Sequence, residues 1–107
     1  MTIDVKPSWI ATDNADNAAA TATKAAVAAQ RHYITSVAGG FDAAVSGATL
    51  ILKSGSTELG RWNVYDTFAL VFPSPIEVAA GTVANLVLEA SGTAGITGAA
   101  TMTGYTL

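Results

Sequence analysis

Cysteine is missing from this sequence of 107 residues, and charged residues make up only 12% of it. Without cysteine, neither a disulfide nor a thiolate metal site can hold the fold together. A nucleic-acid surface needs clustered lysine and arginine, and a membrane helix needs roughly 20 apolar residues in succession. The chain has neither feature, so we expect no nucleic-acid and no membrane partner; its five basic residues are scattered as Lys6, Lys24, Arg31, Lys53 and Arg61.

Ordinary soluble domains contain about 25% charged residues. Half that share implies that much of the surface is not free surface. Residues 1 to 10 include Asp4 and Lys6 and no apolar run. We therefore expect no signal peptide there, and a protein that is made and kept in a cytoplasm or released by lysis.

Residues that could perform chemistry are equally sparse. His32 is the single histidine, and we expect it to be a hydrogen-bonding residue at a strand edge, with a pH-sensitive interface group as the alternative. The stretch 13–17 lacks the spacing and closing glutamate of a calcium loop. Glu77 and Glu89 could meet, but their segments indicate solvated rim positions rather than a glycosidase pair. We predict no enzymatic activity, no cofactor and no metal.

From residue 20 onward the sequence predicts an all-β domain. Runs rich in β-branched and aromatic residues alternate with turns, and we expect Gly39-Gly40 and Pro73-Ser74-Pro75 to end strands. About eight short strands at roughly ten-residue spacing predict a jelly-roll-like antiparallel β-sandwich. A helix over residues 18–29 is the alternative to the first of them. The expected strands are 21–23, 33–37, 48–53, 58–65, 68–72, 76–78, 82–90 and 96–105.

The first nineteen residues differ from the rest, so we divide the chain into an extended N-terminal arm, 1–19, and a sandwich domain, 20–107. Trp9 and Ile10 form an isolated apolar pair within a polar segment. One interpretation is an unstructured terminus. The other is an arm that docks on a partner through these two residues, because tryptophan is enriched at interface hot spots.

Two neighbouring segments, 60–65 and 67–72, carry large apolar groups that alternate onto both faces of a strand. One small core can cover only one face, so a second copy of the chain is the simplest cover for the other. The expected subunit-interface residues are Trp62, Tyr65, Phe68, Leu70 and Phe72. A sugar-binding platform of Arg61, Trp62 and Tyr65 is the alternative for part of this set.

Several short runs resemble small virion proteins of tailed phages, over about residues 20 to 107: Arg31–Ser36, Phe72–Ile76 with Ala80-Gly81, Leu88–Thr93, and Thr103-Gly104-Tyr105. The resemblance implies a compact jelly-roll-like sandwich, usually a homotrimer without enzymatic activity. It implies a decoration or cement subunit on the capsid surface of a bacteriophage, with the major capsid protein as partner. We add Tyr105 to the expected subunit interface and assign capsid attachment to Trp9 and Ile10, outside the resemblance. A receptor- or glycan-binding module of a tail or fibre is the alternative function.

Overall fold

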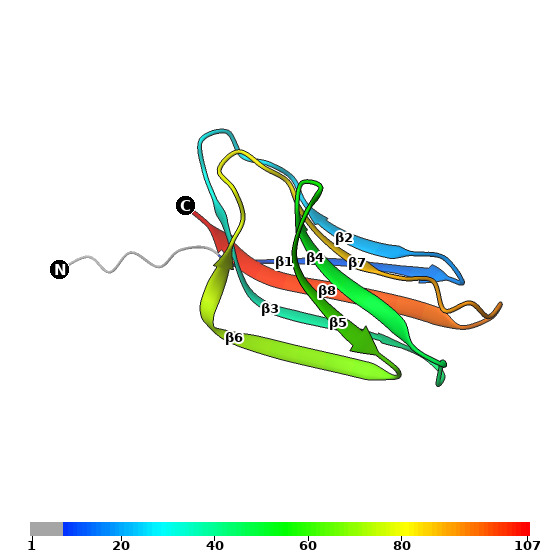
Figure 1. Ribbon diagram of the computed structural model, residues 1–107. Coiled ribbons are helices and arrows are strands. Elements are labelled where there is room, and N and C mark those ends of the chain that lie inside the picture. The colour runs from blue at the N-terminus through cyan, green and yellow to red at the C-terminus, as the bar shows by residue number, and fades with distance from the viewer. Residues whose placement is uncertain (1–7) are drawn as a thin grey trace.

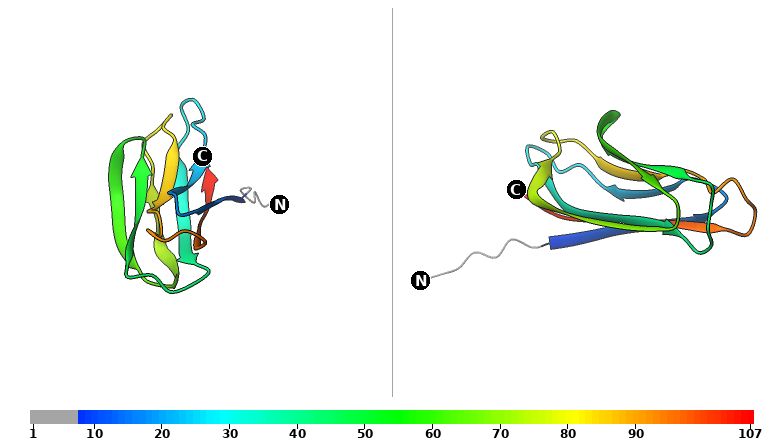
Figure 2. Two further views of the ribbon diagram at one scale, coloured as in Figure 1. Left: turned by 90° about the vertical axis from the view of Figure 1, so that its right-hand side faces the viewer. Right: turned by 60° about the horizontal axis from the view of Figure 1, so that its bottom comes forward.

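A computed structural model describes residues 8–107 as two antiparallel four-stranded sheets (Figures 1 and 2). The strand order is β1-β8-β3-β6 in the first sheet and β2-β7-β4-β5 in the second. The chain crosses repeatedly between the sheets, which is the arrangement of a jelly roll. The predicted fold class is therefore confirmed. The strands are β1 (Ser8–Asp16), β2 (Ala20–Lys24), β3 (His32–Phe41), β4 (Ala48–Ser54), β5 (Thr57–Val64), β6 (Thr67–Glu77), β7 (Ala84–Leu88) and β8 (Thr97–Thr106).

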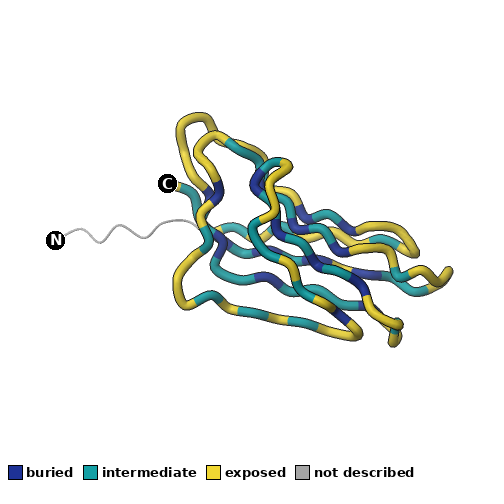
Figure 3. Tube along the Cα trace, in the orientation of Figure 1, coloured by how far each residue is buried: buried dark blue, intermediate teal, exposed yellow. Residues whose placement is uncertain are grey.

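The core lies between the two sheets and follows from period-two alternation along the strands. In β4 every second residue is buried, including Leu50 and Leu52, and Leu86 of the neighbouring β7 is buried beside them. Ile34 of β3 and Met102 of β8 cover this layer from the other sheet. Figure 3 shows the buried residues concentrated on these central strands. Across residues 8–107 no helix is long and apolar enough to cross a membrane.

The hairpin between β4 and β5 turns at Gly55-Ser56, where the sequence predicts a short glycine-containing turn. Ser54 pairs with Thr57, so the loop has two residues. Gly55 has a φ of 61°, and glycine adopts this left-handed conformation without the steric cost of a Cβ atom. The turn sets the register that places Leu50 opposite Trp62.

The predicted strand ends at Gly39-Gly40 and at Pro73 are both wrong. β3 continues through both glycines to Phe41. A Cβ atom on Gly40 would lie 2.8 Å from the Cα atom of Thr67, so this position needs glycine. Glycine here permits β6 to approach β3 closely rather than ending the strand.

β6 passes through both prolines because it is an edge strand. Its pairing with β3 moves from Ser36–Val71 to Ile34–Ile76. Residues 72–75 therefore bulge opposite Thr35. A bulge on an edge strand accommodates prolines, which cannot donate to the ladder.

The structure also differs from the predicted arm. β1 pairs with β8 along its whole length, from Ser8–Tyr105 to Asp16–Thr97, so the sandwich includes residues that the sequence assigned to the arm. Its polar residues fit an edge strand, where Asp13 Oδ2 accepts the backbone N–H of Thr21 at 2.9 Å. The part of the predicted arm before Ser8 lies outside the described residues.

Candidate interaction surfaces

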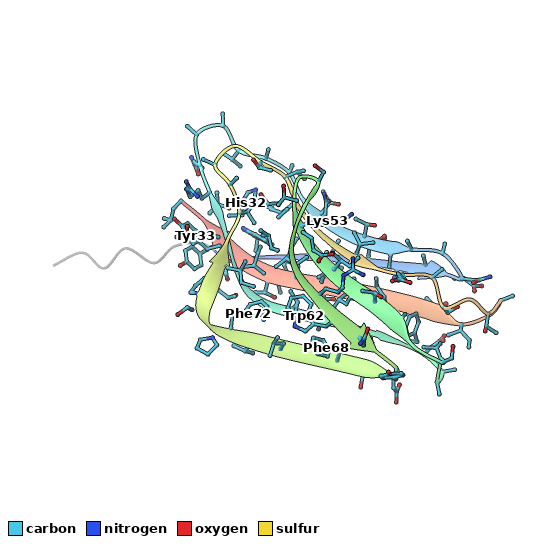
Figure 4. The ribbon with its side chains drawn as sticks, viewed as in Figure 1. His32, Tyr33, Lys53, Trp62, Phe68 and Phe72 are labelled. Carbon is cyan, nitrogen blue, oxygen red and sulfur yellow. The ribbon has the colours of Figure 1, made fainter. Side chains whose placement is uncertain are left out.

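The sandwich is incompletely closed between its edge strands β5 and β6. Trp62 of β5 faces inward, and its ring centroid lies 6.1 Å from that of Phe68 and 6.0 Å from that of Phe72, both on β6. All three are partly buried against the core, as is Leu70, and no residue of β6 is fully buried. Figure 4 shows the three labelled rings between the two strands. We call Trp62, Phe68, Leu70 and Phe72 the open flank.

The prediction that these strands carry large apolar groups on both faces holds in part: Val71 of β6 and Tyr65 after β5 are exposed large hydrophobic side chains, but the largest groups of β6 share one face. In β6, Phe68, Leu70 and Phe72 share the inward face, and the outward face carries the smaller Thr67, Ala69 and Val71. The large groups are half-buried because the edge of the sandwich is open. Sequence alternation cannot show this, because it does not show which strands lie at an edge.

The predicted interface set does not form one surface. Trp62, Phe68, Leu70 and Phe72 lie together in the open flank. Tyr65 follows the end of β5, is 60% exposed, and its ring lies against Gly47. Tyr105 lies on the outer face of the first sheet, stacked on Tyr33 with ring centroids 5.1 Å apart.

A second surface is the outer face of the first sheet. The register aligns three successive rows of residues across β1, β8, β3 and β6, and none of the twelve side chains is ionisable. Ile10 and Val71, at the two ends of one row, are each 72% exposed. We call this the uncharged face; its rows are Ile10-Thr103-Ser36-Val71, Thr12-Thr101-Ala38-Ala69 and Asn14-Ala99-Gly40-Thr67.

A shallow trough of about 670 Å³ crosses one end of the uncharged face. Its lining includes Gly40 and Ala99, the smallest residues of their row, and also the carboxylate of Asp42. Phe68 of the open flank also contributes to its lining. The trough therefore reaches the strand at which the two surfaces meet.

The outer face of the second sheet has a different character. It carries Lys53, Glu58 and Arg61 on neighbouring strands. The guanidinium of Arg61 donates two hydrogen bonds to Glu58 Oε1, at 2.6 and 3.0 Å, and this contact holds the pKa of the Glu58 carboxyl below its ordinary value. These charges are those of an ordinary solvated sheet face. The sequence alone does not reveal this contrast between a charged outer face on the second sheet and an uncharged one on the first, because the pairing register decides which residues share a face.

Trp9 is held within the domain, although the sequence suggested a docking residue. Its indole Nε1 donates to the Thr106 hydroxyl at 3.0 Å. Its ring meets His32 edge-on at 5.7 Å, with the Lys24 ammonium over it at 5.5 Å. Ile10, which points outward from the same strand, is the exposed member of the predicted attachment pair.

His32 is buried on the inner strand β3, so the prediction of a strand-edge position is wrong. Its Nε2 atom lies 2.8 Å from the carbonyl oxygen of Ala25, which can only accept, so Nε2 carries the proton. Nδ1 then accepts from the Thr106 hydroxyl at 2.7 Å, and that hydroxyl accepts from Trp9. One hydroxyl thus links β1, β3 and β8; nothing in the sequence indicated this role for Thr106.

The carboxylates of the described chain do not converge. Residues 8–107 contain no group of three His, Cys, Asp or Glu side chains suited to a metal ion. Asp16 Oδ1 accepts the backbone N–H of Gly95 at 2.9 Å and so fixes a loop. Glu77 pairs with Arg31 at 3.7 Å at the end of β6, and Glu89 follows β7 in the other sheet.

A sugar platform of Arg61, Trp62 and Tyr65 does not form. Arg61 points to the outer face of the second sheet, and Trp62 points inward as alternation predicts. The interpretation of Trp62 as a core or interface residue agrees with this placement.

No known protein family matches the sequence, and no curated protein matches it. Among solved structures, the chain is similar to a CBM36-1 domain of a multidomain xylanase from the hindgut metagenome of Trinervitermes trinervoides, with 9% identity and a TM-score of 0.49 over 90% of this chain and 96% of that one. It is also similar to FlhE (13% identity, TM-score 0.41, 92% and 97% covered) and to a protein of Bacillus endospore appendages (16% identity, TM-score 0.36, 100% and 97% covered). Neither a family nor a function follows from likenesses this distant.

Proposed function

We propose that this protein is a structural virion protein, a decoration or cement subunit that binds the phage capsid lattice as a homotrimer and stabilises it. The observation that carries the proposal is the open flank, where three aromatic rings remain half-buried between two edge strands. The sequence resemblance to small virion proteins supports the capsid setting. Function then resides in buried contact area, and we propose no catalysis, cofactor or metal.

The size of the open flank bounds the stabilisation that it can supply. A fully buried aromatic side chain removes about 150–250 Å² from water, so covering the half-buried flank removes on the order of 300 Å². At about 25 cal/mol per Å² this contributes roughly 8 kcal/mol. Association costs about 4–15 kcal/mol, so a stable trimer needs further contact area outside the flank.

Attachment to the capsid is proposed to involve Ile10, because Trp9 is occupied inside the domain. A truncation that tests attachment without disturbing the sandwich removes residues 1 to 7 only. A deletion of residues 1 to 19 would also remove β1, which pairs along its length with β8. We expect the shorter truncation and Ile10→Ser to leave a folded domain that binds particles more weakly than the intact chain.

The test combines the mass of the assembly in solution with the position of the protein on intact particles. Light scattering or native mass spectrometry at micromolar concentration is expected to give three times the mass of the 10.8 kDa chain. Imaging of intact phage particles is expected to show hundreds of copies of the protein on the head. A monodisperse monomer that does not bind capsids would overturn the proposal, and a handful of copies at a tail tip would favour the receptor- or glycan-binding alternative.

A further inference from the structure

We propose that residues 1–6 of one copy add as a strand to the free edge of β6 in a neighbouring copy. The apolar side chains of this donor segment then cover the open flank of that neighbour. Three such exchanges, each from one copy to the next, close the trimer. This inference rests on the homotrimer of the proposed function and names the segment that covers its flank.

The donor segment has the sequence pattern of a strand with one apolar face. Its residues alternate with a period of two: Met1, Ile3 and Val5 are apolar, and Thr2, Asp4 and Lys6 are polar. In an extended strand, side chains at this spacing point to the same face. Pro7 follows and cannot donate to a ladder, so the pattern ends where the donor segment ends. The sequence of these residues, which precede the described part of the chain, therefore suits an edge with apolar side chains on one face.

The free edge of β6 has the complementary features. β6 has a neighbour on one side alone, so the backbone groups on its other side have no strand partner within residues 8–107. Phe68, Leu70 and Phe72 point inward at the same two-residue spacing as the apolar residues of the donor segment. Six residues, 67–72, precede the first proline of β6. Strand addition to such an edge combines backbone hydrogen bonds with side-chain contacts, and the hydrogen bonds supply contact that the flank alone lacks.

The charges of the donor segment favour β6 over β5, the other strand at the opening. Beside β6, Asp4 and Lys6 would extend the outer face of the first sheet, where the adjoining side chains of residues 67–71 are uncharged. Beside β5 they would compete with the existing ion pair of Glu58 and Arg61. A like charge directly opposite on a neighbouring strand is destabilising.

The position of Ser8 favours a donor segment from another copy. Ser8 lies on β1, and β1 and β6 are the opposite edges of the first sheet. Three strand spacings separate them by roughly 14 Å, which uses about four of the seven preceding residues in an extended chain. The other three span about 10 Å, less than the roughly 14 Å along β6 from Phe68 to Phe72. The segment of a neighbouring copy has no such limit.

The exchange leaves the proposed capsid contact free. Ile10 lies on β1, at the edge of the sheet opposite β6. Removing residues 1–7 therefore weakens particle binding through loss of the trimer and its avidity. Ile10→Ser weakens particle binding in a protein that remains trimeric.

Paired substitutions on the two faces of the donor segment test the first step of this inference. Ile3→Asn with Val5→Asn is expected to convert the trimer to monomer at micromolar concentration, measured by light scattering. Thr2→Asn with Lys6→Asn, the matched control, is expected to remain trimeric. Both variants leave residues 8–107 unchanged, so the sandwich keeps its sequence. Two trimeric variants would overturn the inference and leave the proposed trimer standing, whereas a wild-type monomer would remove the proposed assembly itself.

Cysteine cross-linking locates the contact, because the chain has no cysteine of its own. Ile3 is the middle apolar residue of the donor segment, and Leu70 is the middle residue of the flank on β6. Facing residues of paired antiparallel strands have Cα atoms about 4.5–5.5 Å apart, which a disulfide can bridge. In a full-length chain with Ile3→Cys and Leu70→Cys, mild oxidation is expected to link copies covalently into trimers. The linkage is expected to form at least tenfold faster than with Thr2→Cys and Leu70→Cys, because Thr2 would point to the other face. Monomers with an internal disulfide, or equal rates in the two proteins, would overturn the exchange.

Discussion

Replacing Thr106 by valine removes one hydroxyl and leaves two polar groups without their partner. That hydroxyl accepts from Trp9 Nε1 at 3.0 Å and donates to His32 Nδ1 at 2.7 Å. The substitution conserves shape, so it tests the hydrogen bonds rather than packing. A buried group left unsatisfied costs about 1–3 kcal/mol. His32 is 1% exposed and incurs this cost in full, whereas the half-buried Trp9 can reach water.

We therefore expect Thr106→Val to lower the free energy of unfolding by about 2–3 kcal/mol. For a domain of this size each kcal/mol lowers Tm by roughly 4–8 °C, so the loss is on the order of 10 °C. The assay is thermal unfolding followed by circular dichroism at one fixed protein concentration. Thr49→Val, on the outer side of β4, is the matched control and is expected to change stability by less than about 0.5 kcal/mol. Equal melting of the two variants would refute the role assigned to this hydroxyl.

Three further outcomes are expected. Gly104→Ala should destabilise the fold by about 1–3 kcal/mol in thermal melting, because the added Cβ would lie 2.9 Å from Trp9 Cζ2 and also against the Tyr33 carbonyl; a wild-type Tm would contradict this contact. In an NMR titration, the Glu58 pKa should lie below the ordinary value of a glutamate because of its hydrogen bond from Arg61, and it should rise in Arg61→Gln. Since the folded pKa is depressed, this pair stabilises the fold above the ordinary carboxyl pKa and the contribution is lost as pH falls through the lowered value; an equal pKa in both proteins would contradict it. Melting with and without a chelator should give the same Tm, and a large drop on chelation would reveal a structural metal.

The sequence by itself determined the fold class. Alternation in β4, the glycine turn at Gly55 and the regular spacing of strands and turns are local properties, and each is visible in the order of residues. Side-chain period and turn chemistry act over a few residues, so a jelly-roll-like sandwich followed from them. The inward orientation of Trp62 was predictable for the same reason.

Only the tertiary structure decided which strands are edges and which residues share a row. The prolines of β6 are compatible with a strand because β6 has a neighbour on one side alone. The polar β1 belongs to the sandwich because it pairs with a strand about ninety residues away in the chain. The uncharged face brings Ile10, Thr103, Ser36 and Val71 into one row from four distant segments. Long-range pairing creates such surfaces, and local sequence patterns do not encode which strands will be neighbours.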